Sequence, residues 1–587
     1  MVAPIWQHAA VDQPSADRLA RALGLEPVIA RLLCQRGLAD PDDAARFLRP
    51  SLDHLHAPSR LAGLPEAVVR IGKALADHER IAIHGDYDVD GITSTVILRR
   101  TLELLGGDVG HFIPDRLRDG YGLQPATIDR LHAEGVTLCI SVDCGIRGME
   151  AAIRARELGL DLIITDHHEP GAALPPAVAV INPKRRDCSY PDKHLAGVGV
   201  ALKLVQALCT AHGREKWLPA FLKVAAIGTL ADVVPLVGEN RVIAKLGLEL
   251  LSRGPHKVGL QALLTASGLA GRRIDGYDVS FVLAPRVNAA GRMSTPDIAT
   301  RLLLASDDAL FEEARGLAQQ LNDENVRRQQ EEAAIVAEAR KIVESDPDIG
   351  ARTVLVVAGE GWHRGVIGIV ASKLVDAFHR PAVVISIDGD DAHGSCRSIP
   401  SFDILSGLEA CADLMTRFGG HKVAAGLSLE RGRIRELRTR LNAYADERLG
   451  PDDLRPRLGI DARLGFRELS GPVAAQIVGL APFGAGNPKP VFSAGSVEIV
   501  DGPRKLKDRH LKMALRQDGR VLRAIAWRGV ERHAFLEEHR ALVDVAYSLE
   551  QNEFNGETYL ELTVADVKPA EGAVLVPAPS VAVEPAV

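Results

Sequence analysis

Four short apolar runs between residues 78 and 235 constrain the fold of this chain more than any other feature. Each run is rich in Ile, Val and Leu without strict alternation, which is typical of strands buried on both faces. Helical patterns, such as those at 91–105 and 148–158, separate the runs, which are RIAIHG (80–85), TLCISVDCG (137–145), LDLIITDHH (160–168) and AVAVIN (177–182). This alternation predicts an α/β domain in which helices cover a parallel sheet.

The rest of the chain divides where the pattern changes, and a length of 587 residues predicts about three or four domains. Residues 306–346 are mostly polar and predict a long helix bridging two domains, with a narrow apolar stripe of Leu310, Ala314, Leu317 and Leu321. Strand patterns at 353–359 and 382–387 predict a second α/β domain, and short alternating segments after residue 457 predict a small antiparallel barrel. The expected parts are an N-terminal extension (1–50), a first α/β domain (51–305), the bridging helix (306–346), a second α/β domain (347–450), the barrel (457–567) and a disordered tail (568–587).

The composition excludes several classes of protein. With 46% hydrophobic and 25% charged residues, the chain fits neither a disordered, a collagen-like nor a coiled-coil protein. Its seven cysteines are scattered, and we find neither a signal peptide nor a run of about 20 apolar residues. We therefore expect a cytoplasmic protein with no disulfide framework and no membrane partner. The formal charge of −7 means that any binding to nucleic acid must depend on local basic patches.

The segment HGDYDVDG, between a predicted strand and a predicted helix, carries the strongest chemical signal. Its residues His84, Asp86, Asp88 and Asp90 occupy alternate positions. In an extended segment such side chains point the same way, as ligands converging on a metal ion would. Like charges this close repel one another unless cations neutralise them. A solvated acidic turn is the alternative, but the strongly apolar flanks disfavour it.

Further acids and histidines end other predicted elements. Asp143 ends one strand, Asp166, His167 and His168 end the next, and Asp232 ends a helical pattern. An adjacent histidine pair alone is weak support, because such pairs more often lie on a surface or in a core. In an open parallel sheet, however, functional groups gather outside the carboxyl ends of the strands. Together these residues predict a site for two metal ions.

The type of ligand indicates the metal and the reaction. Carboxylates and imidazoles without a thiolate fit Mn²⁺ best, with Mg²⁺ as runner-up, rather than structural zinc. Two such ions about 3.5–4 Å apart can lower the pKa of a shared water and clamp a phosphoryl group. The expected chemistry is hydrolysis of a phosphoester or a phosphoanhydride.

These motifs resemble those of the DHH phosphoesterase superfamily, and closely those of its RecJ family of single-strand-specific DNA exonucleases. The matching strings are HGDYDVDG, SVDCG, TDHHEP and GTLADVVPL, and later GWHRGVIGIVASKL, GSCRSIPSFDI and FGGHKVAAGLSL, which resemble a DHHA1 domain. The likeness runs from about residue 50 to residue 567. It implies a DHH catalytic domain joined by the long helix to a DHHA1 domain, followed by an oligonucleotide-binding (OB) barrel. The implied activity is metal-dependent 5′→3′ hydrolysis of single-stranded DNA to mononucleotides, in DNA repair and recombination.

The resemblance also implies roles for the clustered residues. It assigns two ions with Asp143 bridging them: His84, Asp88 and Asp143 hold one, and Asp90, Asp143, His167 and Asp232 hold the other. Asp86 would support a ligand without touching the ions or would position water, and His168 would donate to the scissile phosphate or to its transition state. Asp166 would orient a histidine ligand.

Several polar residues beside glycines are candidates for phosphate contacts, which we expect on rigid turns. Taken singly, each Arg is more often a surface charge than a ligand. The resemblance instead implies that such groups grip the nucleic-acid backbone and its terminal phosphate. The candidates are Arg116, Arg286, Asn288, Arg292, Ser395, Arg397 and His421.

The barrel region contains a local basic stretch. Residues 501–533 hold ten Lys or Arg against four acids, a formal charge of +6. Trp527 and Arg528 follow an apolar strand and could stack on bases and bind phosphate. A solvated basic face is the alternative, but the implied OB barrel favours a DNA-guiding surface. Its candidate residues are Lys505, Lys507, Arg509, Trp527 and Arg528.

Two other functions stay open at this point. One is a DHH phosphodiesterase acting on short oligonucleotides, cyclic dinucleotides or pyrophosphate, although such enzymes are generally shorter and lack the basic barrel. The other is a non-catalytic DNA-binding scaffold, although every ligand position is filled here. The family implies a single-strand-binding protein and a helicase as partners, and nothing in the sequence demands more than a monomer.

Overall fold

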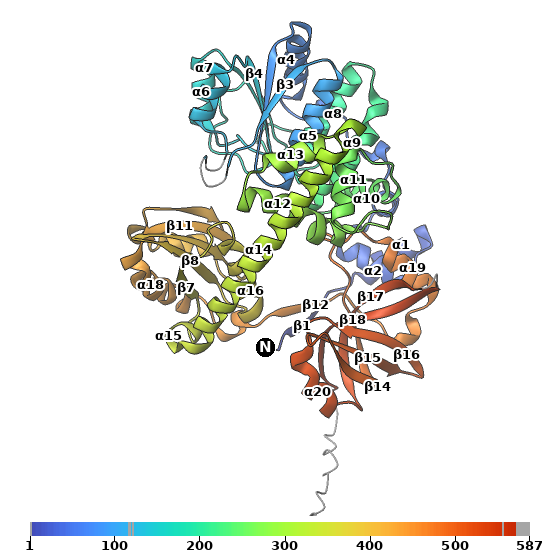
Figure 1. Cartoon of the computed structure of the whole chain (residues 1–587). Helices are drawn as coiled ribbons and strands as arrows, with labels where there is room; N and C mark the ends of the chain where they lie inside the picture. Colours follow the sequence, from blue (N-terminus) through green and yellow to red (C-terminus); the bar gives the residue numbers. More distant parts are fainter. Residues whose placement is uncertain (1–2, 116–118, 120–121, 555–556, 571–587) are drawn as a thin grey trace, which may run out of the picture. The chain divides into compact units, whose positions relative to one another are not determined.

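The computed structural model describes residues 3–115, 119, 122–554 and 557–570 (Figure 1). Contacts divide it into two compact units. Unit 1 contains residues 51–456, and unit 2 combines residues 4–50 with the described residues from 457 onward. Among the described helices, none combines the length and the apolar character needed to cross a membrane.

A five-stranded, fully parallel sheet forms the first domain of unit 1, in the order β3-β2-β4-β5-β6. The strands are β2 (Arg80–Gly85), β3 (Asp108–Phe112), β4 (Leu138–Val142), β5 (Asp161–Thr165) and β6 (Ala179–Ile181). Four of them confirm the strands predicted from the apolar runs. The edge strand β3 was not predicted, because its sequence DVGHF lacks a run of Ile, Val or Leu and is only partly buried.

Helices cover both faces of this sheet, which is why its strands are apolar throughout. They are α4 (Leu64–Ala76), α5 (Val89–Leu104), α6 (Pro125–Ala133), α7 (Met149–Glu157) and α8 (Gly197–Ala211). In β2, Ile81 and Ile83 pack with α4, α5 and α8, whereas Ala82 packs with α6 and α7. Figure 1 shows these two groups of helices on opposite sides of the strands.

A helical layer with its own core follows the sheet. It consists of α9 (Leu218–Ala231), α10 (Gly238–Arg253), α11 (Val258–Ala266), a π-helix (Asp278–Leu283), α12 (Ala284–Met293) and α13 (Asp297–Leu304). The segment PRVNAAGRMS was expected on a turn, but it lies in α12. Pro285 suits the first turn of a helix, and Val287, Ala289 and Ala290 are buried, so a helix is favoured over a turn.

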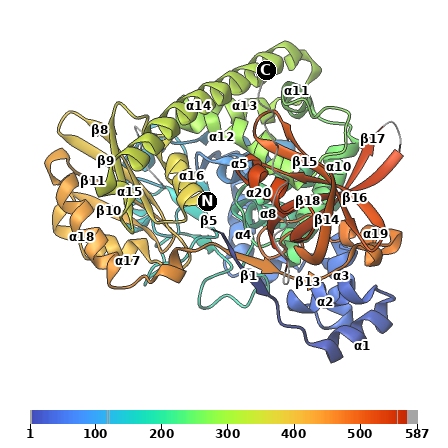
Figure 2. The ribbon, with the colours of Figure 1, turned by 90° about the horizontal axis from the view of Figure 1, so that it is seen from below.

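The predicted bridging helix is α14 (Phe311–Ser345), 35 residues long and continuous in Figure 2. Its first half packs into the helical layer through Ala314, Leu317 and Leu321. Its second half packs into the next domain through residues such as Ile335 and Ala339. The stripe prediction was wrong for Leu310, which precedes the helix and is 37% exposed.

The second α/β domain of unit 1 has a mixed five-stranded sheet in the order β10-β11-β9-β8-β7. Its elements are α15 (Pro347–Gly350), β7 (Leu355–Glu360), α16 (Ile367–Phe378), β8 (Ala382–Asp388), β9 (Asp391–Arg397), α17 (Ile404–Glu409), β10 (Arg417–His421), β11 (Ala424–Glu430) and α18 (Ile434–Asp446). Strands β7 and β8 are parallel and the other pairs antiparallel. Ser395, Arg397 and His421 were expected on turns but lie in strands β9 and β10, because backbone pairing with β11 continues through them.

Unit 2 is a closed barrel to which the N-terminal residues are attached. The barrel strands are β13 (Ala462–Arg463), β14 (Phe492–Leu506), β15 (His510–Gln517), β16 (Arg520–Ala526), β17 (Val543–Phe554) and β18 (Glu557–Pro569), with helices α19 (Gly471–Gly479) and α20 (His533–Glu538). Pairing of β14 with β17 closes the barrel. Strand β18 includes residues 568–569, and residues 571–587 of the expected tail lie outside the described residues.

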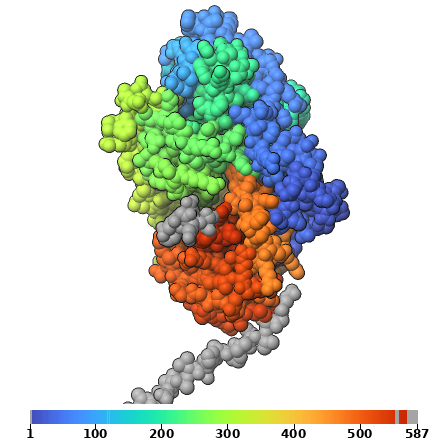
Figure 3. All heavy atoms as spheres, turned by 90° about the vertical axis from the view of Figure 1, so that its right-hand side faces the viewer, coloured from blue at the N-terminus to red at the C-terminus, as the bar shows by residue number. Residues whose placement is uncertain are grey.

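The N-terminal segment shares the hydrophobic core of the barrel. It contains β1 (Ile5–His8), α1 (Gln13–Leu23), α2 (Pro27–Gln35) and α3 (Pro41–Leu48). Leu19, Leu32 and Phe47 belong to the same buried cluster as Phe492 and Tyr547 of the barrel. Strand β1 also pairs in parallel with β12 (Arg457–Ile460). Figure 3 shows these dark-blue residues against the orange surface of the barrel.

Candidate metal centre and nucleic-acid contacts

The loop between β2 and α5 is folded tightly over the start of the helix. Asp88 is the N-cap of α5, and its Oδ1 accepts hydrogen bonds from the N–H groups of Asp90 (2.9 Å) and Gly91 (3.1 Å). A Cβ at Gly91 would lie 2.5 Å from the backbone of Asp86, so only glycine fits there. The N–H of Val89 donates to Asn288 Oδ1 at 3.1 Å, which ties the loop to α12. The acids of this loop are therefore held in fixed directions.

Neighbouring elements bring the other predicted ligands to the same place. Strands β2, β4 and β5 are adjacent and parallel, so residues at or beyond their carboxyl ends meet at one edge of the sheet. His167 Nε2 lies 3.3 Å from Asp143 Oδ1, 3.7 Å from Asp232 Oδ2 and 3.9 Å from Asp90 Oδ2. Ligand atoms each about 2.1 Å from one cation have separations of this size. Asp86, Asp88 and Asp143 form an adjoining group that could hold a metal ion.

Four buried atoms of the cluster lack the hydrogen-bond partners that buried polar atoms normally have. His84 Nε2, Asp143 Oδ1, His167 Nε2 and Asp232 Oδ2 make no hydrogen bond among the described residues. Burying such an atom without a partner costs free energy. Cations would supply the missing partner for these atoms, and the atoms are the nitrogen and oxygen types that Mn²⁺ accepts. The donor set therefore fits divalent ions.

The electrostatics of the cluster agree with a site built for cations. Burial, with repulsion from neighbouring carboxylates, raises the pKa of Asp86 to about 8, of Asp90 to about 7 and of Asp232 to about 9. The same causes raise the pKa of Asp143 well above its ordinary value. Burial lowers the pKa of His84 and His167 to about 4. Both imidazoles are consequently neutral near pH 7, which is the form that binds metal.

Asp166 differs from the clustered acids described above in its hydrogen bonds. Its Oδ1 accepts a hydrogen bond from His168 Nδ1 at 2.7 Å, and its Oδ2 accepts from the N–H of Ile146 at 2.9 Å. Burial alone would raise the pKa of Asp166, but the hydrogen bond and charge of His168 lower it. Asp166 in turn outweighs burial at His168 and raises the pKa of that imidazole. Asp166 thus orients His168 rather than the ring of His167, whose side chain is also less exposed (10% against 38%).

The start of α8 completes the site, and sequence reasoning missed it. The N–H groups of Gly197 and Val198 donate to the two carboxylate oxygens of Asp90, both at 2.7 Å. A Cβ at Gly197 would lie only 2.4 Å from Asp143 Oδ1. The one available signal was the glycine-rich string AGVGV, which by itself does not indicate which acid its N–H groups face. Asp143 itself has a left-handed backbone (φ 60°), so its position depends on surrounding contacts.

The expected phosphate donors fall into separate groups. Arg286 donates to Asn322 Oδ1 and to the carbonyl of Val282, and Arg292 Nη1 donates to the carbonyl of Gly365. The structure thus places both guanidinium groups in contacts within unit 1. Exposed His421 is not in the metal cluster, and Arg116 lies outside the described residues.

Ser395 and Arg397 lie together at the start of α16. Arg397 Nη1 is 3.4 Å from Ser395 Oγ. A Cβ at Gly368, in the first turn of α16, would lie 3.0 Å from Ser395 Oγ and 3.3 Å from Arg397 Nη2. The glycine therefore lets both polar groups approach the helix N-terminus, where N–H groups favour anions. We call this group the α16 cradle.

The predicted basic residues of unit 2 form an exposed patch around the β14–β15 hairpin, which we call the hairpin patch. Lys505, Lys507 and Arg509 lie on the hairpin and are exposed. The ring of Trp527, 53% exposed, contacts the edge of His510, with 4.9 Å between centroids. The N–H of Arg528 donates to His510 Nδ1 at 2.8 Å. An aromatic ring beside cations is a suitable surface for a single nucleic-acid strand.

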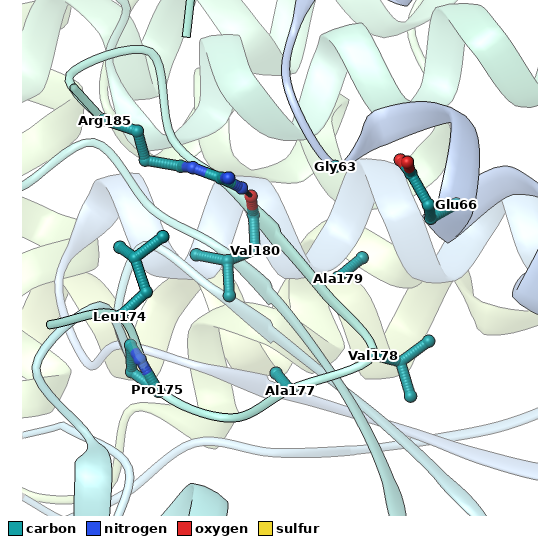
Figure 4. A pocket seen from close by; sticks show the side chains of 9 residues that line it. All are labelled: Gly63, Glu66, Leu174, Pro175, Ala177, Val178, Ala179, Val180 and Arg185. Atoms are coloured by element: carbon teal, nitrogen blue, oxygen red, sulfur yellow. Dashed lines mark hydrogen bonds between the residues drawn. The ribbon is translucent and has the colours of Figure 1, made fainter. Parts of the chain in front are cut away.

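A separate cavity of about 300 Å³ lies along the edge strand β6 (Figure 4). None of the predicted site residues lines it. Arg185 extends across it and donates to the carbonyl of Val180. This cavity belongs to the edge of the sheet and not to the metal centre.

The raised carboxylate pKa values predict how stability depends on pH. The folded state holds protons on Asp86, Asp90 and Asp232 up to pH 7–9, whereas unfolded Asp has a pKa of about 3.9. Because the folded state binds more protons, its free energy of unfolding falls as pH rises. The lowered pKa values of His84 and His167 oppose this effect only below about pH 6.5.

In a chelator, the melting temperature should therefore fall between pH 6.5 and pH 8.5. Added Mn²⁺ should raise it more at the higher pH, because the ions replace protons. Differential scanning calorimetry measures both effects, and Asp232→Asn should reduce the pH slope. A melting temperature that rises with pH in the chelator would contradict this electrostatic description.

Comparison with known proteins agrees with these features. Family models match in three places: the DHH family N-terminal domain at residues 80–229, the DHHA1 domain at 351–447 and the RecJ OB domain at 460–566. Together they place the parallel sheet, the second α/β domain and the barrel in the order predicted from sequence.

Relatives match this chain over nearly its full length. The single-stranded-DNA-specific exonuclease RecJ of Bacillus subtilis is 38% identical over 571 residues, covering 96% of this chain and 71% of that protein. The Escherichia coli enzyme of the same name is 34% identical and covers 93% and 96%. Structures of Thermus thermophilus RecJ in complex with Mn²⁺ and Mg²⁺ give TM-scores of 0.82 and 0.76 at 33% and 31% identity, covering 97% of this chain and 80% and 79% of those chains. The chain belongs to the RecJ family of the DHH phosphoesterase superfamily.

Proposed function

We propose that this chain is a metal-dependent exonuclease that hydrolyses single-stranded DNA to mononucleotides in the 5′→3′ direction, in DNA repair and recombination. The observation that carries the proposal is the buried cluster whose ligand atoms lack hydrogen-bond partners, represented by His84, Asp143, His167 and Asp232. The relatives named above are single-stranded-DNA-specific exonucleases, which supports the choice of substrate. The structures of the Thermus protein with Mn²⁺ and Mg²⁺ support the choice of ions.

Six residues would hold the two ions, with Asp143 shared: His84, Asp88, Asp90, Asp143, His167 and Asp232. When bound, the ions would lower the pKa of a water and offset the charge that develops on the phosphoryl oxygens. The chain keeps the ligands in place through the N-cap bonds of Asp88 and the backbone bonds to Asp90. Asp86 faces the same space and would position the attacking water.

His168 would donate from its ring to the scissile phosphate. Its raised pKa favours the protonated imidazole, and its hydrogen bond to Asp166 fixes the ring orientation. A positioned cationic donor stabilises the negative charge of the transition state. Asp166 would thereby act through His168.

The polarity and the strand preference would come from two further groups. The α16 cradle, with Ser395 and Arg397, would bind the terminal 5′ phosphate through charge and backbone N–H groups. The hairpin patch would bind the phosphate backbone and stack on the faces of bases, which a duplex covers and a single strand exposes. Further candidates for contacts with the strand are Arg116, Arg286, Asn288, Arg292 and His421.

The domain limits, partners and location are also proposals. The sequence patterns support a catalytic DHH domain at 51–305, a bridging helix at 306–346, a DHHA1 domain at 347–450 and an OB domain at 457–567. A single-strand-binding protein and a helicase that supplies the strand would be the partners of a monomer in the cytoplasm. The DHH phosphodiesterase alternative is disfavoured by the matched OB domain, and the scaffold alternative by the clustered acids and histidines that could hold metal ions.

Asp143→Asn should abolish hydrolysis, since it removes charge from the ligand that the two ions share. We expect the rate of hydrolysis to fall by more than about 100-fold. This is more than the loss of about 10–100-fold that follows when a residue supporting a metal ligand is removed. The exposed acid Asp108 provides a matched control, and Asp108→Asn should keep full activity.

The assay uses Mn²⁺ with single strands blocked at the 5′ or the 3′ end and with blunt duplex. Mononucleotides should appear only from single strands with a free 5′ end. Turnover of dinucleotides or pyrophosphate without any release from DNA would contradict the proposed substrate. An inactive wild type that still binds DNA tightly would support the scaffold instead.

Changes in the hairpin patch should weaken binding to single-stranded DNA. Trp527→Ala should cost about 1–3 kcal/mol if a base stacks on the ring. Lys507→Ala should reduce the slope of log affinity against log salt by about 0.7, the value for one phosphate contact on a single strand. Fluorescence anisotropy in a chelator measures both effects without hydrolysis.

Arg516 on β15 offers a matched control, because Glu498 already neutralises it at 2.6 Å. Arg516→Ala should change the salt slope less than Lys507→Ala. Equal slopes of log affinity against log salt for the wild type and Lys507→Ala would show that the hairpin patch does not contact the DNA.

A further inference from the structure

We propose that Asn240, in the first turn of α10, is a positioning residue that sets the metal affinity of the site. It would do so by holding together two backbone segments outside α10, residues 194–196 and the turn at Pro235. This inference rests on the proposed metal centre and deepens it. Nothing in the ligand motifs identifies Asn240, which carries no charge and lies eight positions after Asp232 in the sequence.

The Asn240 side chain uses its whole amide to join these segments. It is fully buried. Its Oδ1 accepts a hydrogen bond from the N–H of Ala196 at 3.3 Å. Its Nδ2 donates to the carbonyl of His194 at 2.5 Å and to the carbonyl of Pro235 at 3.1 Å. One side chain thus bonds residues 194–196 and residue 235 at once.

The first segment leads directly into the ligand cluster. Ala196 is followed by Gly197 and Val198, whose N–H groups hold both oxygens of Asp90 at 2.7 Å. The Cα of Gly197 also lies so close to Asp143 that a Cβ would come within 2.4 Å of Oδ1. A shift of this segment would therefore disturb two ligands from two different elements.

The second segment carries a ligand itself. Asp232 caps the end of α9, and Pro235 lies three residues further on. Between them, Val233 has a left-handed backbone (φ 61°), which a β-branched residue avoids unless its surroundings impose it. The bond from Asn240 to Pro235 is one contact that fixes the far end of this strained turn.

Asn240 can act as an anchor because its own helix start is held firmly. The N–H of the adjacent Glu239 donates to Asp192 Oδ2 at 2.8 Å, and the Glu239 carboxylate pairs with the buried Lys203 at 2.9 Å. Asp192 also accepts from the N–H of His194 at 3.0 Å. The amide of Asn240 therefore projects from a fixed point and adds bonds to both segments, residues 194–196 and residue 235.

Removing a residue that orients metal ligands, without itself touching the metal, typically weakens metal binding by about 10–100-fold. We expect Asn240→Ala to weaken Mn²⁺ binding by that factor, measured by isothermal titration calorimetry and by the loss of the free-ion signal in electron paramagnetic resonance. Neither measurement depends on nuclease activity.

Asn442 provides a closely matched control in the second α/β domain of unit 1. It is also buried, at 2% exposure, and it makes the same three kinds of bond. Its Oδ1 accepts from the N–H of Val354 at 2.8 Å, and its Nδ2 donates to the carbonyls of Val354 and Arg438 at 3.1 and 2.9 Å. Asn442→Ala should lower the melting temperature as Asn240→Ala does, but it should leave Mn²⁺ affinity unchanged. A purely structural role for Asn240 would predict the same Mn²⁺ affinity in both variants.

A milder variant keeps the test decisive if Asn240→Ala does not fold. Asn240→Ser retains one short polar group, and it should fold and still bind Mn²⁺ more weakly than the wild type. A folded Asn240→Ser protein with wild-type Mn²⁺ affinity would overturn the positioning role while leaving the proposed function intact. A wild type that binds no Mn²⁺ would overturn the metal centre as well, so the two failures are distinguishable.

Discussion

Several carboxylates lie close together inside the first domain of unit 1, and the surrounding structure has to offset their mutual repulsion. Asp86, Asp90 and Asp143 are almost completely buried within one small space, and Asp88 and Asp232 adjoin them. Without cations, burial and mutual repulsion favour the protonated forms of Asp86, Asp90 and Asp143 and so raise the pKa of each. The chain offsets part of the cost with backbone N–H groups, at α5 for Asp88 and at α8 for Asp90. Divalent ions bound by these carboxylates would offset the rest of this electrostatic cost.

The parallel sheet is the element that makes such a concentration of charge possible. The side chains at the ends of the adjacent strands β2, β4 and β5 meet at one edge of the sheet. Helices on both faces of the sheet exclude water from the core on which these side chains rest. Glycines then allow the approach of neighbouring elements: Gly91 lets the first loop fold over α5, and Gly197 lets α8 reach Asp143. The packed core therefore holds together carboxylates that would otherwise move apart because they repel one another.

Sequence reasoning predicted the parts of the fold that follow from apolar runs and charge spacing. It predicted four strands of the parallel sheet, the long helix α14 and the barrel, and the structure brings most of the predicted ligands together. It missed β3, whose polar edge sequence carries no strand signal, and the attachment of residues 4–50 to the barrel core, which depends on contacts distant in sequence. It also placed Arg286 and Ser395 on turns, because their glycine-rich neighbourhoods do not reveal the burial or pairing that forms a helix or strand. Backbone donors such as Gly197 and uncharged anchors such as Asn240 carry no local chemical signature.

This buried cluster would hold two divalent ions that share Asp143. The most direct test is the number of Mn²⁺ ions bound per chain, measured by titration together with electron paramagnetic resonance at saturation. We expect two ions per chain and a spectrum of magnetically coupled ions, because a carboxylate shared by both ions would keep them about 3.5–4 Å apart. A single ion per chain, or two ions with uncoupled spectra, would contradict it.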